Sequence, residues 1–190
     1  MNVPFCEWLQ IRIVENNLQQ LSPGRRIGGG AEAEVFETQN PDVVIRIENK
    51  VHISSCDKIM MNPQVQETRG VGKIFGQTVV DGKTWTYKER VDPNWATPLN
   101  KILKNEGADD NVIKKIYNSL SNLSVVATAG KMYERKPWHQ HQTMDEFSSL
   151  CQNFKSLSGF IKALSFVPSH DLNSNNYGLT KDGRLVIIDC

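Results

Sequence analysis

The sequence predicts an α+β fold, in which a five-stranded antiparallel sheet with one helix precedes a mainly helical part. Two observations lead to this prediction. Short apolar and β-branched runs, separated by glycine-rich, Asn-Pro and Asp-Gly turns, dominate residues 1–91, as in antiparallel strands. In residues 92–190 the apolar residues instead recur at the spacing of amphipathic helices. We therefore expect two small lobes, residues 1–91 and residues 92–190.

The first lobe is expected to carry an N-terminal helix and one further helix between its strands. Apolar residues recur at helical spacing from Phe5 to Leu21, before a Pro-Gly pair that ends the segment. The further helix is expected to begin at Ser54, where Asp57 completes a capping box. Pro63 is expected to end or bend this helix, because proline removes a backbone hydrogen bond.

Five strands are expected, at residues 25–28, 34–39, 43–48, 72–80 and 83–91. A glycine cluster separates the first two strands, and Asn-Pro-Asp separates the next two. The last two strands are expected to form a hairpin around Asp81-Gly82, because this dipeptide suits the positive φ angles of a two-residue turn.

The second lobe begins with a polar stretch, residues 92–110, which we expect to be irregular. Helical periodicity follows in residues 111–127, and the basic, aromatic residues 130–142 are expected to form a loop. A single long helix is expected over residues 143–164, with a capping box in its first turn. The chain then reads as a loop, a short strand, an Asp-Gly turn and a short strand.

Charge, cysteine spacing and the lack of long apolar runs indicate the kind of protein and its expected location. The net charge is +1 with both signs interspersed, so nothing favours nucleic acid or a membrane surface. Cys6, Cys56, Cys151 and Cys190 form no Cys-x-x-Cys pair or zinc spacing, which suits reduced thiols. The N-terminus has no basic, apolar leader, and no apolar run approaches the roughly 20 residues of a membrane span. We expect a soluble cytoplasmic protein.

The glycine cluster is the first candidate site. Ile27, Gly28, Gly29 and Gly30 lie between two expected strands, and Val35 follows on the second of them. Glycines permit positive φ and let backbone N–H groups approach phosphate closely. A plain hairpin turn is the alternative. The cluster is not a Walker A loop, because no Gly-Lys-Ser/Thr follows and the next element is a strand.

Arg46 is the second candidate, within the strand Val43-Val44-Ile45-Arg46-Ile47. Alternation along the strand places Arg46 on the opposite face from Ile45 and Ile47. Its guanidinium could bind phosphate bidentately. The alternative is a solvent-exposed arginine.

The C-terminal segment contains the most specific pattern. Asp171 and Asn176 stand five positions apart on an expected loop, and Asp189 follows thirteen residues later, after an apolar run. Each feature is common in surface turns, which is the alternative interpretation. Their combination, in this order after a glycine loop and a long helix, is much harder to obtain by chance.

In chain order these features resemble the protein-kinase-like family, and their compactness resembles the minimal kinases that phages encode. The resemblance places Gly28 and Gly30 at the first two glycine positions of the loop that covers ATP, with Ala33 at the third. Val35 falls where the family packs a valine over adenine. Arg46 falls where the family has a phosphate-binding lysine, and its larger fork is not equivalent to an ammonium group. The resemblance also implies a carboxylate partner for it in the helix region, either Asp57 or Glu67.

By the same resemblance, residues 88–91 correspond to the hinge of the family, where backbone groups at Glu89 and Val91 would bind adenine. Asp171 corresponds to the aspartate that accepts the proton of the acceptor hydroxyl. Asn176 and Asp189 would hold Mg²⁺ on the ATP phosphates, because this ion prefers carboxylate and amide oxygens. ATP and Mg²⁺ are thus the expected cofactors.

The resemblance has limits. Residues 92–142 match nothing in the family, and Cys190 follows Asp189 where the family has Phe-Gly and an activation segment. We therefore expect the middle segment, a second copy of the chain or a target protein to supply the platform for the substrate.

The implied function is an ATP- and magnesium-dependent kinase that phosphorylates a hydroxyl, on a protein Ser or Thr. Two alternatives stay open. Arg46 and the short C-terminal part favour a catalytically weak pseudokinase that binds and inhibits a partner. A small-molecule phosphotransferase of the aminoglycoside or choline kinase type is the other, although Ser169 stands where that type usually has histidine.

Overall fold

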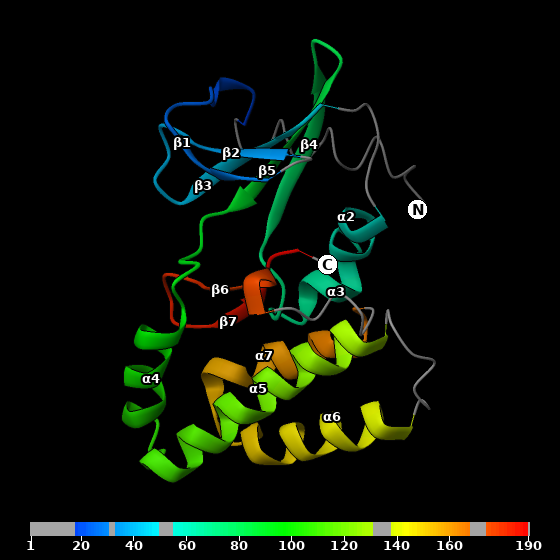
Figure 1. The fold of residues 1–190 in the computed structure, drawn as a ribbon. Helices are drawn as coiled ribbons and strands as arrows, with labels where there is room; N and C mark the ends of the chain where they lie inside the picture. Colours follow the sequence, from blue (N-terminus) through cyan, green and yellow to red (C-terminus); the bar gives the residue numbers. More distant parts are fainter. Residues whose placement is uncertain (1–17, 31–32, 50–54, 131–137, 168–173, 190) are drawn as a thin grey trace. The chain divides into compact units, whose positions relative to one another are not determined.

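The structure, a computed structural model, describes residues 18–30, 33–49, 55–130, 138–167 and 174–189 (Figure 1). The chain forms two compact units. Residues 1–58 and 73–90 make up the first unit, and residues 59–72 and 91–190 make up the second. Within the described ranges, no helix combines the length and apolar character that crossing a bilayer requires.

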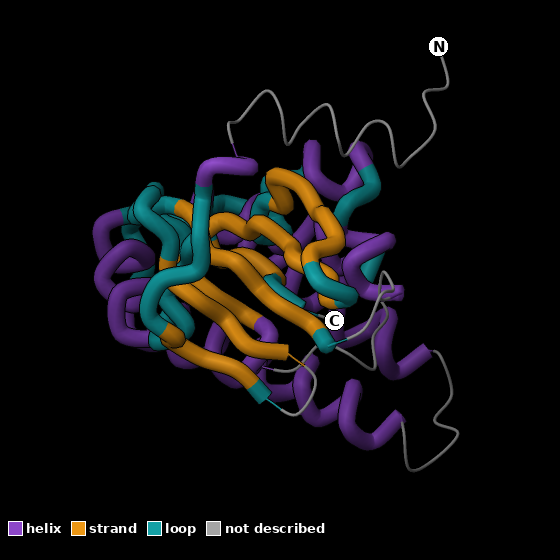
Figure 2. Tube along the Cα trace, turned by 90° about the horizontal axis from the view of Figure 1, so that it is seen from above, coloured by secondary structure: helices purple, strands orange, loops and turns teal. Residues whose placement is uncertain are grey.

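The first unit is built on a five-stranded sheet in which all neighbouring strands are antiparallel, as predicted. Figure 2 shows these strands side by side in orange. Their spatial order is β1-β2-β3-β5-β4. The strands are β1 (Arg26–Gly29), β2 (Ala33–Glu37), β3 (Val43–Glu48), β4 (Ile74–Val80) and β5 (Lys83–Glu89). With the helices of the second unit, this sheet confirms the predicted α+β class.

The hairpin between β4 and β5 forms around Asp81-Gly82, as predicted. Val80 pairs with Lys83, which leaves Asp81 and Gly82 as the two turn residues. Their φ angles are +49° and +74°, the positive values that a type I′ turn needs at both central positions. Asparagine, aspartate and glycine tolerate this backbone best, so the dipeptide sets the register of the hairpin.

The two faces of this sheet differ in polarity. One face carries the apolar core of the unit, where Ile45 and Tyr87 pack with Leu18 of the short helix η1 (Leu18–Gln20). The predicted N-terminal helix otherwise lies outside the described residues. The other face is polar and still largely buried, since alternation along β3 turns Arg46 and Glu48 away from the apolar core.

Two short helices follow β3. α2 (Ser55–Met60) ends before Pro63, as predicted, and the predicted start at Ser54 lies outside the described residues. α3 (Pro63–Glu67) then begins at the proline itself. The Asn62 side chain accepts a hydrogen bond from Gln64 N and caps α3, while Pro63 needs no partner at the first helical position.

The second unit contains four longer helices and a short hairpin. Helices α5 and α6 lie side by side (Figure 1). The helices are α4 (Ala96–Asn105), α5 (Asp110–Gly130), α6 (Trp138–Cys151) and α7 (Lys155–Leu164). The helix η3 (Ser174–Asn176) leads into the antiparallel strands β6 (Tyr177–Leu179) and β7 (Leu185–Ile187), which confirms the predicted two-strand ending.

The predicted irregular segment at residues 92–110 is wrong, because α4 occupies most of it. Leu99 and Leu103 lie one helical turn apart and are fully buried. Pro98 lies in the first turn, where a missing N–H breaks no helical hydrogen bond. Leu99, Ile102 and Leu103 are the large apolar residues of α4, and this one short group among polar residues was too short a pattern to indicate a helix.

The predicted single helix over residues 143–164 is also wrong, since the chain forms α6 and α7 with a break between them. α6 begins at Trp138, inside the segment expected to be a loop. The break is stabilised by a residue far away in the sequence. Glu106, the residue that follows α4, accepts hydrogen bonds from Ser156 N at 3.1 Å and Ser156 Oγ at 2.8 Å. This carboxylate caps the first turn of α7 and favours a new helix start.

An aromatic cluster organises the core of the second unit. The Tyr177 ring lies 6.0 Å from Trp95 and meets Phe160 edge-on at 5.0 Å. Trp95 in turn stacks on Tyr117, and Phe160 contacts Phe147. Such pairs add stability beyond the buried area alone. These contacts hold Tyr177, the first residue of β6, in position, and so position the preceding residue, Asn176.

The Tyr177→Phe variant is expected to be more stable than the wild type, by about 1 kcal/mol. The Tyr177 hydroxyl is buried and has no hydrogen-bond partner among the described residues, so its removal costs no bond there. Burial also raises its pKa, so at pH above about 10 the unfolded state releases this proton first and the wild type loses stability. The advantage of the variant should therefore grow above that pH, as measured by urea unfolding.

Tyr117→Phe provides the matched control for this prediction. The Tyr117 hydroxyl donates a hydrogen bond to the carbonyl of Ala96, so the same change should destabilise the protein there. Equal effects of the two substitutions would contradict the interpretation.

Candidate functional site

In the first unit, three of the predicted nucleotide-binding residues lie in one row across the sheet. Gly28 pairs with Val35, and Val35 pairs with Arg46 on the next strand. The row continues through Thr86 to Gln77, whose side chains are hydrogen-bonded at 2.8 Å. Paired residues on neighbouring strands place their side chains on the same face. Residues from all five strands, far apart in sequence, are thereby brought onto one surface.

The glycine turn needs glycine for a steric reason. Gly29 has φ +146°, and a Cβ atom there would lie 2.8 Å from the carbonyl oxygen of Ala33. Gly30 N donates to that same oxygen at 2.9 Å and closes the turn. Ile27 and Gly28 precede it on β1, which is exposed along its length. The arrangement agrees with a hairpin turn and with a phosphate-covering loop alike.

Arg46 has carboxylate partners on both its own strand and a helix. Its Nη1 atom pairs with Glu48 and lies 3.3 Å from Asp57 Oδ2 on α2. Asp57 Oδ1 lies 3.7 Å from Lys88 Nζ on β5. The Arg46 side chain is only 14% exposed, so it is not the solvent-exposed arginine of the alternative interpretation. Of the two helix carboxylates considered for it, Asp57 is the one in contact.

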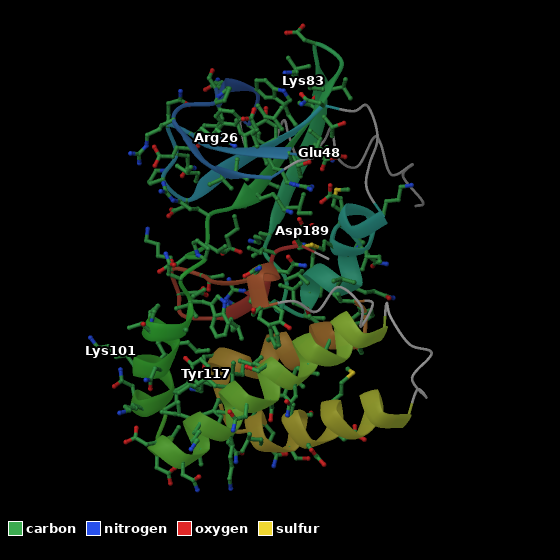
Figure 3. All side chains as sticks on the ribbon, viewed as in Figure 1. Arg26, Glu48, Lys83, Lys101, Tyr117 and Asp189 are labelled. Carbon is green, nitrogen blue, oxygen red and sulfur yellow. The ribbon has the colours of Figure 1, made fainter. Side chains whose placement is uncertain are left out.

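Glu48 and Lys88 extend this group of charges. Glu48 was not among the predicted site residues, and Lys88 was expected only as part of the hinge segment. Together with Arg46 and Asp57 they form a buried quartet of two cations and two carboxylates, whose formal charges cancel. Figure 3 labels Glu48 at the end of β3. The two-residue alternation that places Arg46 on this face places Glu48 there too, so strand periodicity could have identified it. Lys88 required the pairing of β3 with β5, which is a long-range contact.

In the second unit, Asn176 and Asp189 lie at the same end of the β6–β7 hairpin. Tyr177 pairs with Ile187, and Ile188 N donates to the Asn176 carbonyl at 2.7 Å. Asp189, labelled in Figure 3, is the next residue. Because the hairpin fixes this register, residues thirteen positions apart meet at one edge. Asp171 lies outside the described residues.

Tertiary contacts hold this edge of the hairpin in place. Trp95 Nε1 donates to the Ser174 carbonyl at 3.2 Å and anchors η3 just before Asn176. On the β7 side, Gly72 N donates to the Ile187 carbonyl at 2.8 Å, and Val71 bridges the same strand. The residues predicted to bind metal are therefore attached to ordered backbone on both sides.

The predicted hinge residues fall where the chain passes from the first unit to the second. Glu89 ends β5, and its N–H donates to the Lys73 carbonyl at 2.7 Å within the first unit. Val91 is the first residue of the second unit after β5. Asp92, which follows, exchanges two backbone hydrogen bonds with Leu179 on β6. The predicted hinge segment is therefore flanked by backbone hydrogen bonds, at Glu89 before it and at Asp92 after it.

No known protein-family model matches the chain, and no curated protein matches it. In the part of the chain that the structure describes, no three histidine, cysteine, aspartate or glutamate side chains gather as a metal site. Each of the two candidate sites, the quartet of the first unit and the Asn176–Asp189 edge of the second, therefore has to be interpreted from its own residues.

Proposed function

We propose that this protein has a protein-kinase-like fold and is an ATP- and magnesium-dependent kinase, which transfers the γ-phosphate to a hydroxyl group of a protein Ser or Thr. The main support is the buried ion pair between Arg46 on β3 and Asp57 on α2. Kinases of the resembled family orient their phosphate-binding cation by such a strand–helix pair. Within this pair, Arg46 lies in the same sheet row as Gly28 and Val35.

The residues of the first unit would bind the nucleotide. Backbone N–H groups of the turn formed by Gly28, Gly29 and Gly30 would bind phosphate, because glycine allows close approach. Gly30 N donates to the Ala33 carbonyl in this structure and would exchange that bond for phosphate. Arg46 would contact the phosphates from the face that it shares with Val35. Val35 and Ile27 would pack against adenine, and backbone groups at Glu89 and Val91 would bind its polar edge.

The residues of the second unit would hold the metal and the acceptor. Asn176 and Asp189 would offer oxygen ligands to a Mg²⁺ ion that also binds the ATP phosphates and neutralises their charge. Two protein ligands are the usual number where a nucleotide shares the ion. Asp171 would accept the proton of the attacking hydroxyl.

One observation favours the pseudokinase alternative. Both Glu48 and Asp57 already pair with Arg46, so phosphate has to compete with bound carboxylates for this cation. Retention of Asp171, Asn176 and Asp189 together favours the enzyme. A small-molecule phosphotransferase has no comparable support from the described contacts.

The test combines nucleotide binding with phosphate transfer. A kinase should be stabilised against heat by ATP with Mg²⁺ more than by ATP alone, because a ligand that binds only the native state raises its melting temperature. Purified protein should also transfer labelled γ-phosphate to itself or to a protein in a lysate, and Asp189→Ala should abolish this. Magnesium-dependent binding without transfer would favour the pseudokinase. Transfer to small alcohols alone would favour the small-molecule phosphotransferase.

A further inference from the structure

The two carboxylates that hold Arg46 are not equivalent. Asp57 contacts Arg46 through Oδ2 and Lys88 through Oδ1, so it is shared by two cations. Glu48 pairs with Arg46 and stands two residues away on the same strand. Both carboxylates are buried, with side chains 4% and 0% exposed for Glu48 and Asp57. The contacts thus separate a shared carboxylate on a helix from a second one on the strand.

We propose that Glu48 competes internally with nucleotide phosphate for Arg46. On this view Arg46 exchanges Glu48 for a phosphate oxygen when ATP binds, whereas Asp57 stays in place and positions both Arg46 and Lys88. The inference rests on the proposed function, because it takes the ATP phosphates as the anion that Arg46 binds. The inference assigns to Glu48 a role in setting nucleotide affinity. Glu48 is not part of the motifs on which the resemblance to kinases rests.

The chemistry of the guanidinium makes this exchange feasible. Its N–H donors form a planar fork. This fork can donate hydrogen bonds to a carboxylate or to a phosphate in the same geometry, so the two anions compete for the same donors. Glutamate has one more rotatable bond than aspartate, and rotation alone can move the Glu48 carboxylate off the fork. Asp57 has a shorter side chain on a helix and contacts two cations at once, so rotation moves its carboxylate less and would break both contacts.

Charge counting indicates the direction of the effect. Arg46, Lys88, Glu48 and Asp57 sum to zero, so the quartet as a whole does not attract an incoming polyphosphate. Removing the charge of Glu48 leaves a net charge of about +1 in a poorly solvated place, where electrostatic attraction is strong. Removing the charge of Asp57 has the same effect on the sum. It also removes the carboxylate that both cations share, and so disturbs their positions.

The matched variants Glu48→Gln and Asp57→Asn test this difference, because each replaces one carboxylate by an amide of the same shape. We expect Glu48→Gln to bind MgATP about threefold to tenfold more tightly, and Asp57→Asn to bind it about tenfold more weakly. Adenosine, which lacks phosphates, should bind the wild type and Glu48→Gln equally. Titration calorimetry with both ligands measures these affinities.

Three outcomes would overturn the proposal. Unchanged or weaker MgATP binding by Glu48→Gln would show that Glu48 does not compete. Equal tightening by both variants would show that charge alone matters and that Asp57 has no positioning role. Tighter adenosine binding by Glu48→Gln would place the effect away from the phosphates. If the wild type binds MgATP and one of these results is found, this inference fails alone, whereas no MgATP binding by the wild type refutes the proposed function as well.

A folding control accompanies these measurements. Thermal unfolding without nucleotide identifies any variant that has lost its structure, since breaking a buried ion pair can be costly. Should Glu48→Gln fail to fold, Glu48→Asp withdraws the carboxylate by one methylene while keeping its charge. That variant should also bind MgATP more tightly than the wild type, by a smaller factor, and weaker binding would again overturn the proposal.

Discussion

Replacing Asp171 by asparagine is expected to lower phosphate transfer by a factor of about 100 or more, because a general base typically contributes this much to a reaction rate. Asparagine keeps the size of the side chain and removes its ability to accept a proton. ATP binding should persist, since this residue is proposed to act on the acceptor hydroxyl and to stay off the metal ions. Initial rates of γ-phosphate transfer and the affinity for MgATP are the two measurements.

The combination of the two measurements identifies the role of Asp171. A loss of transfer with unchanged MgATP affinity is the expected result and indicates an effect in the transition state. A parallel loss of affinity would assign Asp171 to nucleotide or metal binding instead, and equal labelling by variant and wild type would refute its catalytic role. Asp145→Asn, which alters an exposed carboxylate on α6, is the control and should transfer phosphate normally.

The Asp171 prediction depends on order in the segment that follows this residue. Ser174 is anchored by Trp95, and Asn176 by its backbone hydrogen bond from Ile188. These contacts lie within the second unit, and the aromatic cluster around Tyr177 supports them. The described residues that follow Asp171 in the sequence are thus held in one place, as the proposed catalytic role requires.

Gly70→Ala is expected to destabilise the second unit by about 3 kcal/mol or more. A Cβ atom at Gly70 would lie 1.9 Å from the carbonyl oxygen of Gly159 in α7, and 2.2 Å from its carbonyl carbon. Both atoms belong to the backbone, so no side chain can rotate away. Gly159 meets the same segment from the other side, since its own Cβ would lie 2.8 Å from the Thr68 carbonyl oxygen.

Gly72→Ala is the matched control, two residues further along the same segment. Its Cβ would lie 3.6 Å from Ile188 Cγ2 and 3.7 Å from the Ile187 oxygen, which are ordinary contact distances. This variant should stay within about 1 kcal/mol of the wild type. Urea unfolding followed by circular dichroism measures both, and equal stabilities of the two variants would contradict the close approach of α7.

The Gly70 contact also affects the proposed site. Ile187 N donates to the Gly70 carbonyl at 2.9 Å, so the segment that packs on α7 also pairs with β7. Asp189 follows β7 directly. We therefore expect Gly70→Ala to reduce any Mg²⁺-dependent binding through misplacement of this edge, even where the protein still folds.

The strands and turns could be predicted well because their signals are local. β3 has the predicted bounds, residues 43–48, and the Asp81-Gly82 turn forms as its φ preferences require. The break between α6 and α7 could not be predicted. Phe147, Phe154 and Leu157 are all buried, so the apolar periodicity runs through the break, while the cap that stabilises it comes from Glu106, fifty positions earlier.

Local signals along the chain were enough to identify residues suited to phosphate and metal chemistry and to place them on turns and strand faces, because turns follow from φ preferences and strand faces from the two-residue alternation. The contacts of Arg46 with Asp57 and Glu48, and of Asp57 with Lys88, arise from packing in the folded chain. Ion pairs of this kind follow from how a helix packs on a sheet, and many carboxylates in a sequence are equally able to supply the charge. The same holds for Asn176 and Asp189, which only the register of β6 with β7 brings to one edge.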